Sequence, residues 1–560
     1  MNKALKTFLR VLHSYSIEER VISILVLAVV LFLVLQSGVS VFKVPSFFTN
    51  QNSTYHEGLV TDRAIIINPL FTDFNEANRE ISSLIFSGLT KYDPQKKTFV
   101  PDLADFKISD DRKTYDFTLK PNLLWHDGQP LTVDDVYFTF HDLIQNPGFQ
   151  NPVLQTDFEG IEIKKVDSQT IEFVLQTPNS FFITNTNIGI VPQHLLATVP
   201  IEQLPNNNFN VKPVGSGPYK IEGSVENFEL GNQIVNVKAF DEYYGEKPKI
   251  QQLHFHLYPE FTDLKKELAN LDIVPKVPAA EVAQLQSASG FQVLNYELPQ
   301  YTAIFLNLNR PIFDKDKVRI ALQKVIDTQQ LLKLLNDKLA VNTPLLDLNQ
   351  SEWIYKTNLQ EAQGALFDSG YKLDKAKNDG YRYDTDGKIL ELTLLSRAYD
   401  DGTPQAEESK KVTDFLIEQW KTAGIKINLE AVDNDTFMQK LLAREYDLIL
   451  AGQSLGYNLD TYAYWHSTQA GEGGLNLSNY KSFAADQLIE KIRDTFDATE
   501  KEKRLKDLAK VIADDIPAIF LYRPRYTLAT NGKMKGMTLE NLAFISDRFA
   551  NINQWCVSCN

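Results

Sequence analysis

Cysteine is nearly absent from this chain of 560 residues. Only Cys556 and Cys559 occur, both close to the C-terminus. No disulfide framework can therefore hold the body of the protein together, and a zinc site built on two cysteine pairs lacks its second pair. The C-x-x-C spacing is shared by redox pairs, but we expect these two residues to close a small disulfide in a tail outside the cytoplasm.

Basic residues are also fewer than acidic residues. The 57 Lys+Arg and 72 Asp+Glu residues give a net charge of -15, which repels phosphate backbones and excludes nucleic acid as the main partner. With 26 Gly, 24 Pro and 43% apolar residues, the composition is that of a globular chain rather than a fibrous or disordered one. The eight histidines show no H-E-x-x-H or comparable spacing. We therefore predict no metal site and no cofactor.

One long apolar run is present near the N-terminus. From Val21 to Phe42 the chain carries no charge, and a helix of this length spans about 33 Å, enough to cross one bilayer. We predict an uncleaved membrane anchor over 21–42, a cytoplasmic segment over 1–20 and a tether over 43–53. A signal peptide cleaved after residue 40 is the alternative.

The orientation of this anchor follows from the basic residues beside it. Four of them precede the run, whereas Lys43 alone follows it closely, and this bias places the N-terminus in the cytoplasm and the rest outside. No cysteine follows the run, which excludes attachment through a lipid-modified cysteine. The body of the protein is expected on the extracytoplasmic face of the membrane.

The stretch 389–452 has the clearest periodicity of the exported body. The predicted elements are a strand over 389–395, a helix over 403–424, a strand over 425–432, a short helix around Phe437 and Leu441, and a strand over 446–451. This β-α-β-α-β order predicts a mostly parallel sheet with helices on its faces. In such sheets ligands bind beyond the carboxyl ends of the strands.

The loop that begins at Gly452 lies at such a strand end. Its fifteen residues mix aromatic and hydrogen-bonding side chains, the mixture that recognition of a polar organic molecule needs. We predict that Gln453, Tyr457, Asp460 and Trp465 contact a ligand. We expect Trp465→Ala and Asp460→Asn to weaken binding without unfolding the protein. The alternative is a buried loop whose aromatic residues belong to the core.

The same loop also matches a catalytic motif. Residues 452–456 read G-x-S-x-G, the nucleophile elbow of α/β-hydrolases, which raises the hypothesis of a surface enzyme using Ser454. The elbow must run directly into a helix, but Gly456 breaks the next turn, and His466 follows too closely for an acid and a histidine on separate loops. We therefore predict that the protein is not an enzyme.

An acidic cluster in the earlier half has a structural explanation. Asp127, Asp134 and Asp135 could pass for catalytic carboxylates, but they stand at a predicted turn and at the start of a helix that runs to Leu143. Aspartate is favoured at both places because its side chain accepts backbone hydrogen bonds. Alternating strands are expected over 113–120 and 170–175.

Several short segments, taken in order, resemble one protein family. They are Asn68 to Leu70, Ile85 to Leu89, Pro101 to Ala104, Trp125 to Val136, Pro213 to Tyr219, Asp241 to Pro248, Phe313 to Leu322 and Asp515 to Tyr522. Together they resemble the family 5 extracellular solute-binding proteins, the oligopeptide-, dipeptide- and nickel-binding components of ABC importers. The resemblance extends over nearly all of residues 60–525.

The resemblance implies an α/β, two-lobed fold of the periplasmic-binding-protein kind (type II, peptide-binding class) behind the N-terminal transmembrane helix. It implies lobe one over 54–303, with an extra subdomain at about 91–211, lobe two over 304–516, and a return to lobe one over 517–560. The chain would cross between the lobes near Tyr301 to Asn307 and near Pro517 to Tyr522.

The resemblance also implies a function. The protein would capture peptides between its closing lobes and deliver them to ABC permease and ATPase subunits, without catalysis of its own. The implied ligand-binding residues are Asn68, Tyr301, Gln453, Tyr457, Asp460, Trp465, Asn476 and Tyr480. The alternatives are a non-peptide ligand such as a sugar, a nickel complex or another polar metabolite, and a receptor or scaffold whose cleft no longer binds a small molecule.

One position departs from the family pattern. In peptide-binding relatives this loop carries an aspartate that receives the α-amino group of the peptide, followed by a D-P or E-P pair. Asp460 falls at the second acidic place, and Tyr457 then stands where the amine-binding aspartate belongs. Recognition of a free peptide N-terminus is therefore open at this stage.

Overall fold

The computed structural model describes residues 54–560 except 62–63, 73–74, 224–232, 289, 342, 344, 346–354, 375, 401, 458–459, 558 and 560. The predicted anchor and its flanks, residues 1–53, lie outside the described residues. Within the described ranges, no helix has both the length and the apolar character that a membrane crossing requires. The residues Thr54–Asn560 form one unit.

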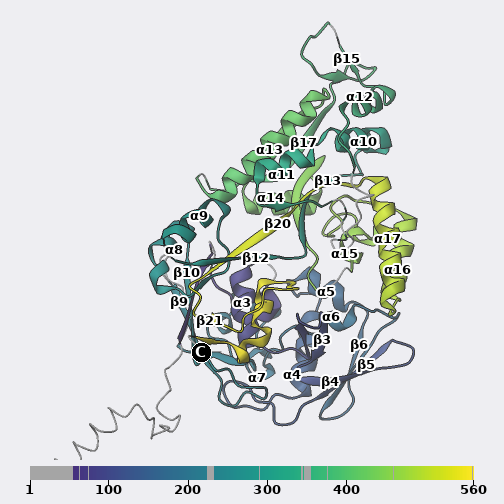
Figure 1. The fold of residues 1–560 in the computed structure, drawn as a ribbon. Coiled ribbons are helices and arrows are strands. Elements are labelled where there is room, and N and C mark those ends of the chain that lie inside the picture. The colour runs from purple at the N-terminus through teal and green to yellow at the C-terminus, as the bar shows by residue number, and fades with distance from the viewer. Residues whose placement is uncertain are drawn as a thin grey trace, which may run out of the picture. The chain divides into compact units, whose positions relative to one another are not determined.

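A twelve-stranded sheet runs through the described part of this unit (Figure 1). Its order is β18-β17-β19-β13-β20-β11-β1-β10-β9-β8, and β12 and β14 also pair with β20. The strands are β1 (Thr54–Val60), β8 (Tyr219–Ile221), β9 (Gln233–Ala239), β10 (Gln252–Tyr258), β11 (Ile273–Val274), β12 (Gln292–Glu297), β13 (Gln300–Leu306), β14 (Lys338–Leu339), β17 (Glu391–Arg397), β18 (Lys426–Val432), β19 (Leu448–Ser454) and β20 (Ala518–Thr530).

Helices pack on this sheet, on the smaller sheets and on one another. They are α3 (Glu76–Ile85), α4 (Val133–Tyr137), α5 (Pro152–Phe158), α6 (Phe182–Asn185), α7 (Gln193–Leu196), α8 (Phe261–Lys266), α9 (Ala279–Ala288), α10 (Asp316–Val325), α11 (Thr328–Leu335), α12 (Leu359–Asp368), α13 (Pro404–Thr422), α14 (Asn434–Ala443), α15 (Tyr462–Trp465), α16 (Phe483–Arg493) and α17 (Ala498–Asp515). The 3-10 helices used below are η2 (Pro69–Phe71) and η10 (Ile545–Gln554).

The predicted order over 389–452 is confirmed in its elements. Thr403 caps α13 by accepting a hydrogen bond from the Ala406 N–H, and Gly424 ends the turn after it with φ +84°, a value that few residues other than glycine adopt. β17 runs parallel to β18 and to β19. The expected mostly parallel sheet is corrected at β13, which lies antiparallel to both β19 and β20.

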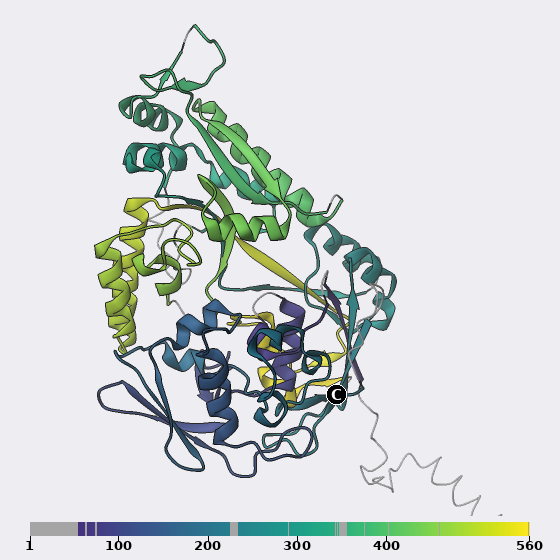
Figure 2. The same ribbon diagram turned by 180° about the vertical axis from the view of Figure 1, so that it is seen from behind.

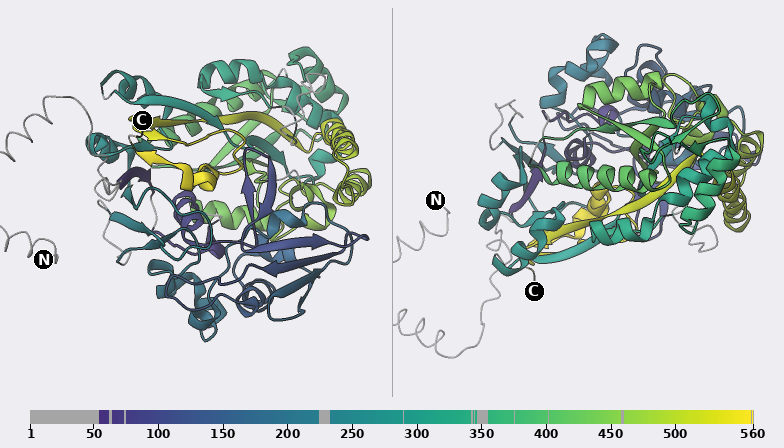
Figure 3. Two further views of the ribbon diagram at one scale, coloured as in Figure 1. Left: turned by 60° about the horizontal axis from the view of Figure 1, so that its bottom comes forward. Right: turned by 90° about the horizontal axis from the view of Figure 1, so that it is seen from above.

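Alternation along the strands divides the core of this region in two. On β13 and β20, Phe305 and Phe520 face one apolar cluster, while Ile304 and Leu521 face another. Helices α14 to α17 contribute to the first of these clusters and α10 to α13 to the second. We call the two clusters together the second core. Helices α16 and α17 pack against each other at one flank (Figure 3).

A separate and larger apolar cluster, here called the first core, lies elsewhere in the unit. It draws residues from Tyr55 to Leu298 and from Leu528 to Trp555. A four-stranded antiparallel sheet contributes to it, in the order β4 (Ala104–Ile108), β5 (Thr114–Leu119), β7 (Thr170–Val174) and β6 (Glu162–Lys165). The expected strands over 113–120 and 170–175 are confirmed by β5 and β7.

The acidic residues of this region have the structural roles expected of them. Asp127 accepts a hydrogen bond from the Gln129 N–H, and Asp135 forms a reciprocal cap with Thr132 at the start of α4. Asp134 pairs with a lysine 2.7 Å away. A π-helical turn from Phe138 to Ile144 continues α4.

The long strand β20 belongs to both parts of the sheet. Its first half pairs with β13 through Ala518 to Tyr522, and its second half pairs with β12 through Arg525 to Thr530. Figure 1 shows it running diagonally from the region of β13 and β17 to the region of β9 and β10, and Figure 2 shows the same strand from behind. The two parts of the sheet are thus joined by one strand, β20, that continues without a break from one to the other.

A buried ion pair fixes the C-terminal segment on the first core. The guanidinium of Arg548 in η10 contacts Glu57 on β1 and Glu80 on α3, and all three side chains are almost fully buried. Because removing one partner would strand a buried charge, this contact holds η10 firmly beside α3. Cys556 and Cys559 form a disulfide at the end of the segment, as predicted.

Candidate ligand-binding site

Tyr457, in the loop after β19, reaches from the second core to the first. The loop turns at Gly456, whose φ of +60° favours glycine. The ring of Tyr457 then packs against Tyr92, Phe99 and Phe544, with ring centroids 5.0–5.1 Å apart. Tyr92 lies on β2 (Thr90–Asp93) and Phe99 on β3 (Thr98–Pro101). The loop leaves the carboxyl end of the strand, as predicted, and contacts the opposite core.

Asp547 accepts a hydrogen bond from the hydroxyl of Tyr457. Its Oδ1 accepts this hydrogen bond at 2.8 Å, and its Oδ2 accepts the N–H groups of Ala543 and Phe544, each at 2.8 Å. Burial raises the pKa of Asp547 from 3.8 to about 6, although these hydrogen bonds favour the charged form. The Tyr457–Asp547 hydrogen bond therefore involves a carboxyl group that titrates near neutral pH.

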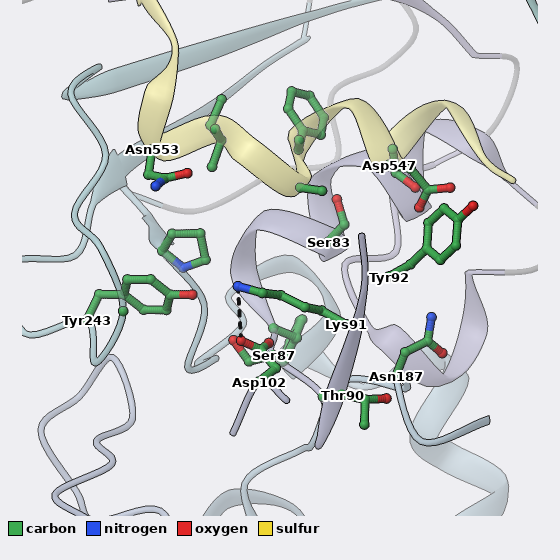
Figure 4. A pocket seen from close by; sticks show the side chains of 18 of the residues that line it. Ser83, Ser87, Thr90, Lys91, Tyr92, Asp102, Asn187, Tyr243, Asp547 and Asn553 are labelled. Carbon is green, nitrogen blue, oxygen red and sulfur yellow. Dashed lines mark ion pairs between the residues drawn. The ribbon is translucent and has the colours of Figure 1, made fainter. Parts of the chain in front are cut away.

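A cavity of about 330 Å³ lies beside this contact, and Tyr457 and Asp547 are part of its wall. Figure 4 shows the polar side chains around it, with Lys91 directed at Asp102, and the Lys91 Nζ to Asp102 Oδ1 distance is 3.5 Å. Further polar lining comes from Ser83, Ser87, Thr90, Asn187, Tyr243 and Asn553. Charges of both signs, hydroxyls and amides next to aromatic rings suit a polar organic ligand.

The backbone around the cavity comes from segments that carried the family resemblance. The N–H of Gly217 donates to the Ile85 carbonyl at 2.8 Å, and the N–H of Leu103 donates to the Gly88 carbonyl at 3.1 Å. A Cβ at Gly215 would come within 1.9 Å of the Ile85 carbonyl oxygen, so no larger residue fits there without movement. These motifs therefore build one wall of the cavity.

A second contact joins the two cores at α16. The N–H of Ser180 donates to the Arg493 carbonyl at 2.7 Å, and Phe181 inserts its ring into the second core. The guanidinium of Arg493 meanwhile holds both oxygens of Asp460, at 2.8–3.1 Å. Asp460 thus supports the end of α16 on which the 91–211 region rests.

Tyr301 and Gln453 lie together, as cross-strand neighbours on β13 and β19. The Tyr301 hydroxyl donates to Gln453 Oε1, and both side chains are buried. Asn68 lies apart from this pair, at the start of η2, where it accepts from the Leu70 N–H and donates to Asn210 Oδ1 at 3.0 Å. Asn68 therefore organises the backbone of the first core.

Trp465, Asn476 and Tyr480 lie together in and beside the second core. Trp465 is only 1% exposed and packs edge-on against Tyr480. The Asn476 amide donates to the carbonyls of His466 and Tyr480, and the Tyr480 hydroxyl donates to Asp515. The packing of Trp465 is what the alternative of a core loop expects, and ligand contact by these three residues stays a prediction. Of the eight predicted residues, all of them described, only Tyr457 lines the cavity.

Sequence reasoning missed Lys91, Asp102, Tyr243 and Asp547. Asp102 and Tyr243 stand inside segments that carry the family resemblance, so the motifs already contained this signal. Lys91 and Asp547 carry no such signal, because lysine and aspartate are ordinary surface residues and nothing in their sequence neighbourhood indicates a position beside a cavity.

The arrangement of Ser454 and His466 is not that of a hydrolase. Gln300 Nε2 lies 3.5 Å from Ser454 Oγ as its hydrogen-bond donor, whereas the His466 ring stacks on Tyr462 and pairs with Thr468. Among the hydrogen bonds of the described residues, none joins Ser454 to His466. A serine nucleophile requires such a bond to a general base.

Comparison with known proteins gives a consistent picture. The family model for bacterial extracellular solute-binding proteins, family 5 Middle, matches residues 98–474. The oligopeptide-binding protein AppA of Bacillus subtilis is 26% identical over 497 residues, which is 84% of this chain and 86% of AppA. The structure of that AppA with a nonapeptide aligns with a TM-score of 0.75 at 24% identity, over 90% of this chain and 99% of the other.

A structure of NikZ from Campylobacter jejuni in complex with Ni(L-His) is similar to the same degree. It aligns with a TM-score of 0.75 at 26% identity, over 90% of this chain and 99% of the other. Proteins that bind a peptide and a nickel complex thus share this fold.

Proposed function

Because the chain belongs to the family 5 bacterial extracellular solute-binding proteins, non-enzymatic components of ABC importers, we propose that it captures peptides outside the cytoplasm and delivers them to a permease. The observation that carries the peptide assignment is the similarity to an oligopeptide-binding protein along 84% of the chain. The cavity supports it, because the wall offers both charges that the two ends of a peptide require.

The proposed mechanism is closure of two lobes over the ligand. Lobe one comprises 54–303 and 517–560, with the subdomain at about 91–211, and lobe two comprises 304–516. Among the contacts that link these parts are Tyr457 to Asp547 and Arg493 to Ser180. Each is a single hydrogen bond and lies in a loop or at a helix end. Both can therefore form and break as the connecting strands bend.

The peptide ends meet opposite charges in this proposal. Lys91 receives the carboxylate, and Asp547 replaces the aspartate that Tyr457 displaces from the family position. The Tyr457 hydroxyl donates a hydrogen bond to the Asp547 carboxyl. The negative charge is therefore carried by Asp547, the hydrogen-bond partner of the loop residue, and not by the loop itself. A cationic ammonium group beside Asp547 would lower its pKa and keep it ionised.

The predicted site residues then divide into two roles. We propose that Gln453, Tyr457 and Asp460 face the ligand in the cleft between the two lobes. The others hold the loop and the opposite wall in place through buried hydrogen bonds and packing, namely Asn68, Tyr301, Trp465, Asn476 and Tyr480. Positioning residues of this kind matter because a ligand site needs a rigid frame.

The anchor over 21–42 is part of the proposal. A tethered binding protein stays near its permease, and the basic residues before the run support this orientation. Membrane fractionation tests it. Mature protein that begins after residue 40 in the soluble extracytoplasmic fraction would replace the anchor by a cleaved signal peptide.

A nickel complex is the second candidate ligand. The similarity to NikZ bound to Ni(L-His), at 26% identity over 90% of this chain, favours it. A small chelate would also fit a cavity of about 330 Å³. The two candidates differ in the metal that must accompany the ligand.

Mass spectrometry of the small molecules released on denaturing the purified 54–560 unit separates the candidates. We expect peptides, identified by their fragmentation. Co-release of nickel with a small chelator would favour the second candidate. If neither appears and the refolded protein binds no member of a peptide library, the peptide proposal is wrong. Tyr457→Ala removes an aromatic residue of the cavity wall and should release less peptide than the parent, whereas Tyr464→Ala, which removes a loop aromatic outside the wall, is its control.

A further inference from the structure

Three histidines gather on one face of the sheet at β1 and β10, away from the first core. Along β10, Leu253 and Phe255 point into the first core, so the intervening His254 and the following His256 point to the other face. His56 on the neighbouring parallel strand β1 pairs in register with His254. Strand pairing therefore brings together imidazoles that lie about 200 residues apart in the chain.

The three imidazoles lie at distances that one metal ion could bridge. One ring nitrogen from each lies within 4.8 Å of the others, and His56 Nδ1 is 3.0 Å from His256 Nε2. The His56 ring centroid lies 4.9 Å from that of His254 and 5.3 Å from that of His256. Two nitrogens bound at about 2.0–2.1 Å in a tetrahedral zinc site are separated by roughly 3.3 Å. Small side-chain rotations would reach this geometry.

We propose that His56, His254 and His256 form a binding site for a divalent transition-metal ion of the zinc class. Imidazole nitrogen is a ligand of intermediate softness that suits Zn²⁺, Cu²⁺ and Ni²⁺ and does not suit Ca²⁺ or Mg²⁺. The two nitrogens that now share a hydrogen bond both become ligands once His56 carries its proton on Nε2 and His256 carries its proton on Nδ1.

The surroundings leave room for a metal ion and a further ligand. A cavity of about 460 Å³ adjoins the cluster and is lined by His56, His256, Glu267 and Asn270, among others. It leaves a fourth coordination position for water or for the Glu267 carboxylate, as three-ligand zinc sites do.

Metal binding would tie β1 to β10 across the chain. The two strands are already paired, and an ion held by both adds a link that only the folded state provides. Binding to the folded state alone raises the thermal midpoint with metal concentration. The site goes beyond the proposed function, because His56, His254 and His256 are not among the residues that line the cavity beside Tyr457.

The test is calorimetric titration of Zn²⁺ into the full chain, purified without a polyhistidine tag and stripped of metal by a chelator. We expect saturable binding of one equivalent and a rise in the thermal midpoint. Because loss of an outer-shell partner already costs about 10–100-fold, His254→Asn and His256→Asn should each weaken binding by at least about 100-fold. His141→Asn is the matched control, since His141 is exposed beside Asp142, and it should bind like the parent.

A second measurement needs no variant. Diethyl pyrocarbonate acylates free imidazole nitrogens, and peptide mass spectrometry of the parent should show that Zn²⁺ protects these three histidines but not His141. Absence of one-equivalent binding, equal binding by the folded His254 and His256 variants, or equal acylation with and without Zn²⁺ would each overturn the proposal. Peptide release from His254→Asn should match the parent, so this test and that of peptide capture can fail separately.

Discussion

The two ends of the segment after β19 differ in what covers them. Tyr457 at its start is half-buried between two cores and lines a cavity, whereas Trp465 at its end is 1% exposed within the second core. Both are large aromatic residues of one loop, and the sequence assigned both to the ligand. The comparison teaches that aromatic content marks a loop as packed, while only the packing partner distinguishes a site from a core.

Replacing Trp465 by alanine should have the largest effect. A buried tryptophan leaves a cavity that the second core cannot fill, and such replacements cost about 3–5 kcal/mol of the free energy of unfolding. Urea denaturation followed by circular dichroism measures this loss. Phe483→Ala, whose side chain is 78% exposed, is the control and should change stability by less than about 0.5 kcal/mol. A Trp465→Ala protein as stable as the parent would return Trp465 to the ligand site.

Asp547 should make stability depend on pH. Its pKa is raised from 3.8 to about 6 in the folded protein, so between these values the folded state keeps a proton that the unfolded state has released. Its contribution is therefore complete below about pH 3.8 and is lost as the pH rises through about 6. At about 1.4 kcal/mol per pKa unit, the difference is about 3 kcal/mol.

The Asp547→Asn variant isolates this contribution. An amide keeps an oxygen acceptor but does not titrate in this range. Unfolding free energies of the parent and the variant are measured from pH 4 to pH 7.5. As the pH rises, the parent should lose the stability that the protonated Asp547 contributes, so the two curves should converge or cross. Parallel pH profiles would show that the Asp547 carboxyl is not buried as described.

Asp460→Asn should have an intermediate effect. The carboxylate forms a two-point contact with Arg493, and both side chains are mostly buried, so its loss should cost about 1.5–3 kcal/mol of unfolding free energy. Asp414→Asn breaks an exposed pair with Lys410 and should cost less than about 0.5 kcal/mol. Equal losses in thermal or urea denaturation would mean that Asp460 is only a surface partner.

Tyr457→Phe should have the smallest effect and the most specific one. It keeps the ring contacts and removes the hydroxyl that bridges to Asp547, a loss of about 0.5–1.5 kcal/mol. Calorimetry with a released peptide should show affinity reduced about 2- to 10-fold. Tyr464→Phe removes a hydroxyl that bonds within the same loop, to the Ser454 carbonyl, and should leave affinity unchanged. Equal affinities of the parent, Tyr457→Phe and Tyr464→Phe would show that the Tyr457–Asp547 hydrogen bond has no part in binding.

The same contrast explains how far prediction from sequence reached. The elements over 389–454 were predictable because each has a local signal, such as the Thr403 cap, the glycine at 424 and the period of two in β18. The direction of β13 was not, since the pairing of a strand is not encoded in its own period. The assignment of individual side chains of the loop to a ligand stays a prediction, because the face that each takes depends on distant residues packed beside it.

The sequence by itself indicated the family through a series of short motifs that resemble it. Composition and short-range periodicity determined the acidic charge, the C-terminal cysteine pair and most strands and helices of 389–452. Only the tertiary structure decided that Tyr457 meets Asp547, that Arg548 meets Glu57, and that His56 meets His254. Each of these contacts joins residues at least 90 positions apart. The physical reason is that alternation along a strand sets which face a side chain takes, whereas its neighbour on that face depends on which distant strand or helix packs beside it.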